Sequence, residues 1–244
     1  MHKAVRILVV ISIAASLIPA AAQAQTAQQV LDKLIEAQGG RAALAAIKDM
    51  TYTGTAEMVQ FGMSGGMTMH QKEPNKMRMD IEIMGMVITQ AFDGEAGWYT
   101  NPQTGTEEAM TEQQAEEMKR QSIGNTALLA PDQLGISYAV KPNETVDGKE
   151  HLVLEQAFKD GRRATLYIDP ATYLLYKTKA MGSSPTGEEM LSEVITSDYG
   201  KEGDIIVAKS LTIFQGGQEF IRVKFTKVAF NSGLTDDFFK RSAK

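Results

Sequence analysis

Charged and apolar residues alternate along residues 76–83, Lys-Met-Arg-Met-Asp-Ile-Glu-Ile, and this period of two predicts a half-buried β-strand. Looser alternation recurs in further runs, and turn pairs such as Asp93-Gly94 and Asp147-Gly148 separate several of them. The runs are residues 51–60, 67–72, 86–92, 136–146, 152–158, 164–168, 174–180, 190–198, 205–214 and 219–230. The pattern predicts a mainly β chain of about eleven short antiparallel strands that curl.

A helical period precedes these strands. Thr26 and Gln29 have the spacing of a capping box, and Gly39-Gly40 supplies a stop signal. Between them lies one apolar stripe, formed by Val30, Leu31, Leu34 and Ile35. We therefore expect an N-terminal helix, followed by a shorter helix over residues 41–48.

A second helical stretch interrupts the strands at residues 111–122, and it also opens on a capping box, Thr111 with Gln114. This helix is polar, and a loop marked by glycine and proline follows it and carries Leu128 and Leu129. Two interpretations remain open. Residues 111–134 are either a movable cover over an apolar cavity or a plain surface insertion between two strands.

The first 24 residues have the features of a cleaved secretory signal. Lys3 and Arg6 are followed by an apolar run over residues 7–18 and by the small-residue cleavage pattern Ala22-Gln23-Ala24. The run is shorter than the roughly 20 residues that a membrane-spanning helix needs. We expect residues 25–244 to form a single soluble domain in the periplasm.

Composition excludes several classes of function. The chain has a net charge of −5, and without Lys3 and Arg6 it keeps 23 basic and 30 acidic residues, a net charge of −7. Nucleic-acid partners require basic surfaces, so none is expected. The chain contains no cysteine, which excludes disulfides and thiolate chemistry. We expect a monomer.

Residues 63–86 contain seven methionines. Unbranched thioether side chains repack around irregular apolar shapes, which suits a binding groove for a greasy ligand. Two alternatives remain open: ordinary core packing, and a soft-metal site built from Met63, Met67, Met69 and His70. Strand geometry disfavours the metal site, because Met69 and His70 project to opposite faces of a regular strand.

The groove hypothesis names a set of candidate ligand contacts on strand faces and in the cover. They are Met67, Met69, Met77, Met79, Ile81, Ile83, Phe92, Trp98, Leu128 and Leu129. A basic cluster beside them, Lys72, Lys76 and Arg78, is expected to be either a solvated outer face or, with Glu73, a rim that meets an acidic head group or a partner.

Catalysis finds no support in the sequence. His70 and His151 are the only histidines after residue 24, and neither lies in a zinc, triad or nucleophile-elbow pattern. Carboxylate pairs such as Asp236-Asp237 lack an apolar pocket that would separate their pKa values. We expect no enzyme, no resident metal and no cofactor.

Two stretches carry a family resemblance. Residues 72–78 fit the pattern K-x-P-N-x-x-R, and residues 93–102 fit D-G-x-x-x-W-x-x-x-P. With the Gly-Gly after the first helix and the late Asp236 to Phe239 stretch, they resemble the outer-membrane lipoprotein carrier superfamily (LolA/LolB-like proteins). The likeness is greatest to the branch called outer membrane lipoprotein-sorting protein.

The resemblance implies an incomplete antiparallel β-barrel, open on one side, with helices across its concave mouth. Members of the superfamily receive lipids or the acyl chains of lipoproteins there, so it implies a carrier or chaperone that delivers them toward the outer membrane. Carriers place an arginine before the Pro-Asn pair, where this chain has Glu73, and Met77 stands where an aromatic is usual. The alternative function is a lipid-sensing adaptor that regulates an envelope membrane protein.

Overall fold

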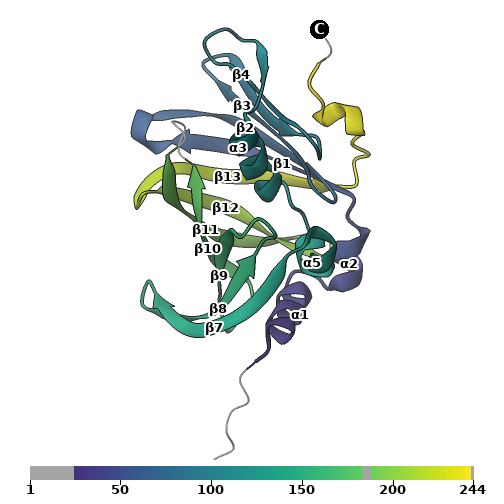
Figure 1. Ribbon diagram of the computed structural model, residues 1–244, viewed down its shortest axis with the longest axis vertical. Coiled ribbons are helices and arrows are strands. Elements are labelled where there is room, and N and C mark those ends of the chain that lie inside the picture. Colours follow the sequence, from purple (N-terminus) through teal and green to yellow (C-terminus); the bar gives the residue numbers. More distant parts are fainter. Residues whose placement is uncertain (1–24, 184–187, 243–244) are drawn as a thin grey trace, which may run out of the picture.

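Thirteen antiparallel strands form one continuous sheet in the described part of the computed structural model, residues 25–183 and 188–242 (Figure 1). The expected signal sequence, residues 1–24, lies outside the described residues. The strands are β1 (Asp49–Met58), β2 (Met63–Lys72), β3 (Lys76–Ile83), β4 (Met86–Phe92), β5 (Gly97–Thr100), β6 (Glu107–Ala109), β7 (Ser137–Val146), β8 (Lys149–Ala157), β9 (Arg163–Ile168), β10 (Leu175–Ser183), β11 (Glu189–Glu202), β12 (Ile205–Gln215) and β13 (Gln218–Phe230).

All eleven strands expected from alternation are present. Two further strands, β5 and β6, bring the number to thirteen. These two strands contain four and three residues, too few to display a period of two. The order across the sheet is β6-β5-β4-β3-β2-β1-β13-β12-β11-β10-β9-β8-β7. Two meanders therefore join where the first strand pairs with the last, and β6 and β7 are left as unpaired edges, so the barrel stays open.

Helices α1, α2 and α3 occupy the segments that the sequence predicted to be helical, and the structure adds two short helices and two 3-10 turns. The helices are α1 (Ala27–Ala37), α2 (Arg41–Ala46), α3 (Glu112–Gln121), α4 (Thr126–Leu129) and α5 (Pro131–Leu134), with 3-10 turns η1 (Val59–Phe61) and η2 (Asp236–Phe239). Both expected capping boxes, Thr26 with Gln29 and Thr111 with Gln114, are confirmed. No helix among the described residues is long and apolar enough to cross a membrane.

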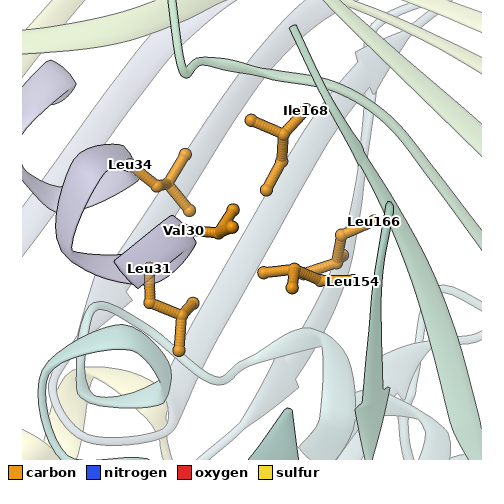
Figure 2. Packing of buried hydrophobic residues seen from close by; sticks show 6 residues of the cluster. All are labelled: Val30, Leu31, Leu34, Leu154, Leu166 and Ile168. Atoms are coloured by element: carbon orange, nitrogen blue, oxygen red, sulfur yellow. The ribbon is translucent and has the colours of Figure 1, made fainter. Parts of the chain in front are cut away.

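The concave face of the sheet is covered by helices. Helix α1 lays its apolar stripe on β8 and β9, where Val30, Leu31 and Leu34 contact three strand residues, Leu154, Leu166 and Ile168 (Figure 2). Helix α2 and the end of α1 pack on β1 and β12 through a second cluster, formed by Ile35, Leu44, Ile47, Met50, Ile205 and Val207. Burial of each such side chain stabilises the fold by about 1.5–3 kcal/mol.

The C-terminal segment binds the opposite, outer face of the sheet. The Trp98 indole donates a hydrogen bond to the Phe239 carbonyl at 2.8 Å, and Phe239 itself is fully buried. The Arg78 guanidinium lies 4.8 Å from the Phe238 ring centroid and 5.7 Å from that of Trp98. The late Phe-Phe pair therefore docks against β3 and β5.

Asp49 ties the start of β1 to the turn after β13. Its buried carboxylate accepts hydrogen bonds from the Ser232, Gly233 and Leu234 amides at 2.7–3.2 Å and from the Ser232 hydroxyl at 2.8 Å. Burial works against the charge, but these hydrogen bonds outweigh it and hold the pKa of Asp49 below its ordinary value.

We expect Asp49→Ala to lower the free energy of unfolding by about 2 kcal/mol at pH 7, because several buried donors lose their acceptor. A lowered folded-state pKa means that the carboxylate stabilises the fold fully above the ordinary value of 3.8 and loses this effect as pH falls through the lower folded pKa. The difference between wild type and variant should therefore shrink in urea titrations carried out below pH 4. Asp32→Ala, at an exposed helix position, is the control. If Asp49→Ala lowered the free energy of unfolding equally at pH 7 and below pH 4, the stabilising role of the Asp49 carboxylate would be contradicted.

Candidate binding hollow beneath the helical cover

A hollow of about 290 Å³ lies between the concave sheet face and the covering segments. Its apolar walls come from α2, β1, β2, β12 and β13, and they include Leu44, Ile47, Tyr52, Met69, Leu211 and Phe225. The roof is the stretch between α3 and α4, residues 123–125. The volume falls at the lower end of the roughly 300–1,000 Å³ that is typical of ligand pockets.

The polar groups of the hollow are neutral. No Asp, Glu, His, Lys or Arg is among the described residues that line it. Burial, with a smaller contribution from neighbouring Tyr199, raises the pKa of Tyr52 to about 12, and burial also raises the pKa of Tyr199. The Tyr52 hydroxyl donates to Met50 Sδ at 3.8 Å, and the Tyr199 hydroxyl donates to the Leu175 carbonyl at 2.5 Å. At neutral pH the hollow is thus an uncharged apolar space with a few hydroxyl and amide groups.

The predicted methionine face divides between the hollow and the core. Met69 lines the hollow. Met67 is buried in a cluster with Ala56 and Phe225, and Met79 and Ile81 pack against this cluster as half-buried neighbours. Met67, Met79 and Ile81 do not line the hollow, and their role as ligand contacts remains a prediction.

Two further candidates, Met77 and Phe92, are opposite each other on β3 and β4. Both are buried beneath α3, where Met118 packs on them. Ile83, at the end of β3, is also buried. A charged residue at position 77 would therefore disturb the contact of α3 with the sheet before it affected any ligand.

Trp98 requires a correction. It is opposite Ala91, which is in turn opposite Arg78, so these three side chains share the outer face of the sheet. The expectation that Trp98 lines the groove is therefore wrong for this arrangement. Its indole anchors the C-terminal turn instead.

Leu128 and Leu129 lie on a short helix, α4, where the sequence indicated a loop. Leu128 packs against both helix–sheet clusters, and Leu129 packs against the cluster around α2. These leucines hold the cover against α1 and α2. The segment therefore contributes to the core, and its movement as a cover remains a prediction.

Several residues of the hollow were not predicted as ligand contacts, among them Tyr52, Tyr199, Leu211 and Phe225. Tyr52, Leu211 and Phe225 lie in runs whose alternation showed that one face is apolar, whereas Tyr199 lies just beyond the run predicted over residues 190–198. Alternation does not reveal that β1 pairs with β13, and this pairing of distant segments brings Tyr52 beside the consecutive strands β11, β12 and β13.

Glu73 holds the cover in place. Its carboxylate lies in the turn between β2 and β3. It accepts hydrogen bonds from the backbone N–H groups of Asn125, at 2.6 Å, and Thr126, at 3.2 Å, and from the Thr126 hydroxyl at 2.7 Å. These groups form the start of α4, where backbone N–H groups favour a negative charge. Glu73 therefore contacts the lid, and a role at an external rim would require these bonds to break.

The same turn makes further contacts with the cover. The Ser122 hydroxyl donates to the Asn75 carbonyl at 2.8 Å, and the Gln71 amide donates to the Ser122 carbonyl at 3.2 Å. Gly124 allows the close approach, because a Cβ atom there would lie 2.2 Å from Glu73 Oε1. We call the contact of Glu73 with Asn125 and Thr126 the latch.

The predicted basic cluster lies on the outer face and binds the chain's own C-terminal segment. Lys72 contacts the Leu234 carbonyl at 2.8 Å and the Asp236 carboxylate at 2.7 Å, and Lys76 donates to the Asp93 carbonyl at 2.5 Å. Arg78 pairs with Asp80 at 3.0 Å. These cations are thus engaged within the protein, and any contact with a partner remains a prediction.

The soft-metal alternative loses its geometry. His70 contacts Thr51 Oγ1 at 3.0 Å and packs edge-on against Phe238 on the outer face. Met67 and Met69 pack in the concave cluster. The imidazole and these thioethers are therefore on opposite sides of the sheet.

A larger concavity of about 580 Å³ lies over β1, β2, β12 and β13. Its lining includes Glu57, Ser64 and Arg222, which are cross-strand neighbours on one face. Glu57 and Arg222 form an ion pair of 3.1 Å in which both side chains are about half exposed. This groove also has apolar lining residues, Ala56, Leu211 and Val223, and it differs from the hollow in that charged side chains line it.

We expect Glu73→Ala to open the cover locally. Hydrogen bonds to a charged acceptor contribute about 1.5–3 kcal/mol, so the amides of Asn125 and Thr126 should exchange hydrogen with solvent at least tenfold faster. Hydrogen exchange resolved to residues measures this directly.

Lys72→Ala is a matched control from the same turn, since its ammonium contacts the C-terminal segment and not the cover. Exchange at Asn125 and Thr126 should be unchanged in that variant. Equal acceleration in both variants would mean that the turn as a whole, and not the Glu73 carboxylate, holds the cover.

Comparisons with known proteins identify the fold. No protein-family model matches the sequence, and no curated protein matches it. A LolA superfamily protein from Nitrosomonas europaea superposes with a TM-score of 0.60 at 13% identity over 89% of this chain and 99% of that one.

Two further solved structures are similar. They are an outer membrane lipoprotein-sorting protein domain from Vibrio parahaemolyticus (TM-score 0.58, 13% identity, 87% of this chain and 95% of that one) and a DUF1329 family protein from Desulfovibrio piger (TM-score 0.60, 10% identity, 88% and 97%). At such identities the likeness is one of architecture. The chain has the open, helix-covered antiparallel fold of the LolA superfamily, as its motifs indicated.

Proposed function

We propose that the protein is a periplasmic carrier or chaperone that binds lipids, or the acyl chains of lipoproteins, in the hollow beneath its helical cover. The observation that carries the proposal is the uncharged hollow of about 290 Å³ between the concave sheet and a latched lid. The fold shared with a lipoprotein-sorting domain supports the same class of cargo. The proposal is one of binding, since the lining offers no group suited to acid–base or nucleophilic chemistry.

At about 290 Å³ the hollow is small for a complete lipid, so loading requires the cover to move. Helices α4 and α5 have four residues each and form part of the lid, and the latch is one of the contacts that hold this lid. Short segments held by a few contacts open at low free-energy cost. Opening would expose the apolar faces of Leu128 and Leu129 and enlarge the space available to an alkyl chain.

The energetics favour a carrier with moderate affinity. Burial of a methylene group contributes about 0.8 kcal/mol, so a chain of roughly 15 carbons could gain on the order of 12 kcal/mol before costs. Breaking the latch and exposing the lid leucines subtract from that gain. A lid that must be opened for each ligand therefore lowers net affinity, and this is what permits release.

Filling the hollow tests the proposal. We expect Leu211→Trp, which places an indole among the lining side chains, to weaken binding of a fluorescent fatty acid at least tenfold. Native mass spectrometry of protein prepared from the periplasm should show a bound lipid in the wild type and less in the variant. Met69→Trp is a second filling variant, should the first fail to fold.

The control is Val140→Trp, because Val140 is exposed on the edge strand β7, away from the lining. It adds the same bulk without occupying the hollow and should bind the probe as the wild type does. Absence of lipid from the wild type, together with no probe binding, would contradict the carrier function.

A further inference from the structure

Asn125 holds a helix-capping position without capping the helix. It precedes α4, where an asparagine side chain ordinarily accepts a hydrogen bond from a backbone N–H group of the first turn. No such bond forms, and the Glu73 carboxylate binds the N–H groups of Asn125 and Thr126 instead. The Asn125 carbonyl accepts hydrogen bonds from the Leu128 and Leu129 amides, at 2.9 and 3.0 Å. The backbone of Asn125 is thus fully paired, and its side-chain amide takes no part in these bonds.

The side-chain nitrogen of Asn125 is buried at the hollow. Asn125 is one of the lining residues, and its Nδ2 atom is shielded from solvent with no acceptor among the described residues. A primary amide carries two N–H donors, and burial of a donor without an acceptor costs free energy. Buried polar atoms of native proteins almost always have a partner. This nitrogen is therefore suited to an acceptor that a ligand supplies.

The Tyr52 hydroxyl is a second donor of the hollow, and its partner is poor. It donates to the Met50 thioether at 3.8 Å, and sulfur is a weak acceptor. Burial raises the pKa of Tyr52 to about 12, so the hydroxyl keeps its proton at neutral pH. The Tyr199 hydroxyl, by contrast, donates to the Leu175 carbonyl. Asn125 and Tyr52 are therefore the lining residues with donors to spare.

These spare donors specify an acceptor without a full charge. No Lys, Arg or His is among the described residues that line the hollow, so a carboxylate drawn into it would lose its water without gaining a counter-ion. The Glu73 carboxylate, which binds the Asn125 backbone, would also repel it. A carbonyl oxygen has two lone pairs and can accept from two donors. The carbonyl of an ester or an amide meets both requirements.

We propose that Asn125 and Tyr52 bind the carbonyl oxygen of an uncharged acyl ester or amide, with its alkyl chain along the apolar walls. This inference rests on the proposed function and names the chemical class of the cargo: an esterified or amide-linked acyl chain, in preference to a hydrocarbon or an ionised fatty acid. Asn125 belongs to the cover and Tyr52 to β1, so a carbonyl held by both joins the lid to the sheet. The contact with the ligand then adds to the latch.

Displacement of the fluorescent fatty acid by a matched pair of competitors tests the proposal. Methyl laurate and dodecyl methyl ether differ only by the carbonyl oxygen, so the ratio of their affinities isolates that contact. We expect the wild type to bind the ester at least tenfold tighter than the ether. Asn125→Leu keeps the shape of the side chain and removes its donors, so the ratio should fall below about threefold. Tyr52→Phe should lower the ratio as well, and it is the second variant should the first fail to fold.

Asn143→Leu is the matched control, because Asn143 is exposed on β7 and lies outside the lining. It makes the same chemical change away from the hollow and should keep the wild-type preference for the ester. Binding of the ether should be similar in the wild type and in all three variants, since the ether reports only on the apolar walls.

The outcomes separate this proposal from the carrier function. Probe binding with equal affinity for the ester and the ether overturns the carbonyl contact and leaves the carrier function standing. A preference that survives in both Asn125→Leu and Tyr52→Phe overturns the assignment to these residues. Tighter binding of ionised laurate than of methyl laurate overturns the uncharged head group. If the wild type binds neither the probe nor either competitor, the carrier function fails and this proposal fails with it.

Discussion

The pairing of β1 with β13 is the constraint on which the rest of the structure depends. It joins the two meanders through the first and the last strand of the chain. The strands β6 and β7, which are consecutive in the sequence, therefore lie at opposite edges of the sheet. The segment that connects them, residues 110–136, must therefore cross from edge to edge. It does so over the concave face as α3, α4 and α5, and the same crossing keeps the barrel open and gives it a lid.

The turn between β2 and β3 couples the two sides of the sheet. Glu73 points to the cover and fixes the start of α4, while Lys72, one residue earlier, binds the C-terminal segment on the outer face. Adjacent strand residues project to opposite faces, which allows a single turn to hold two separate segments. A negative side chain at this position fits the backbone N–H groups of α4, whereas an arginine would meet donors with another donor.

The methionine-rich stretch serves two places, which answers why thioethers collect there. Met67, Met69, Met77 and Met79 face the concave side, where they fill space between sheet and cover. Met84 and Met86 lie at the exposed hairpin end. Flexible, polarisable side chains pack well against irregular neighbours, which suits the four concave positions.

The sequence by itself determined the local structure. Alternation set eleven strands, the boxes at Thr26 and Thr111 set two helix starts, and opposite parity separated Met69 from His70. Local periodicity records only which face of an element is apolar. Tertiary pairing decided which faces meet. As a result Trp98 lies on the outer face and Met77 is buried beneath α3. The same pairing places Tyr52, Leu211 and Phe225 around one hollow. These contacts join residues far apart in the chain, and no local pattern contains that information.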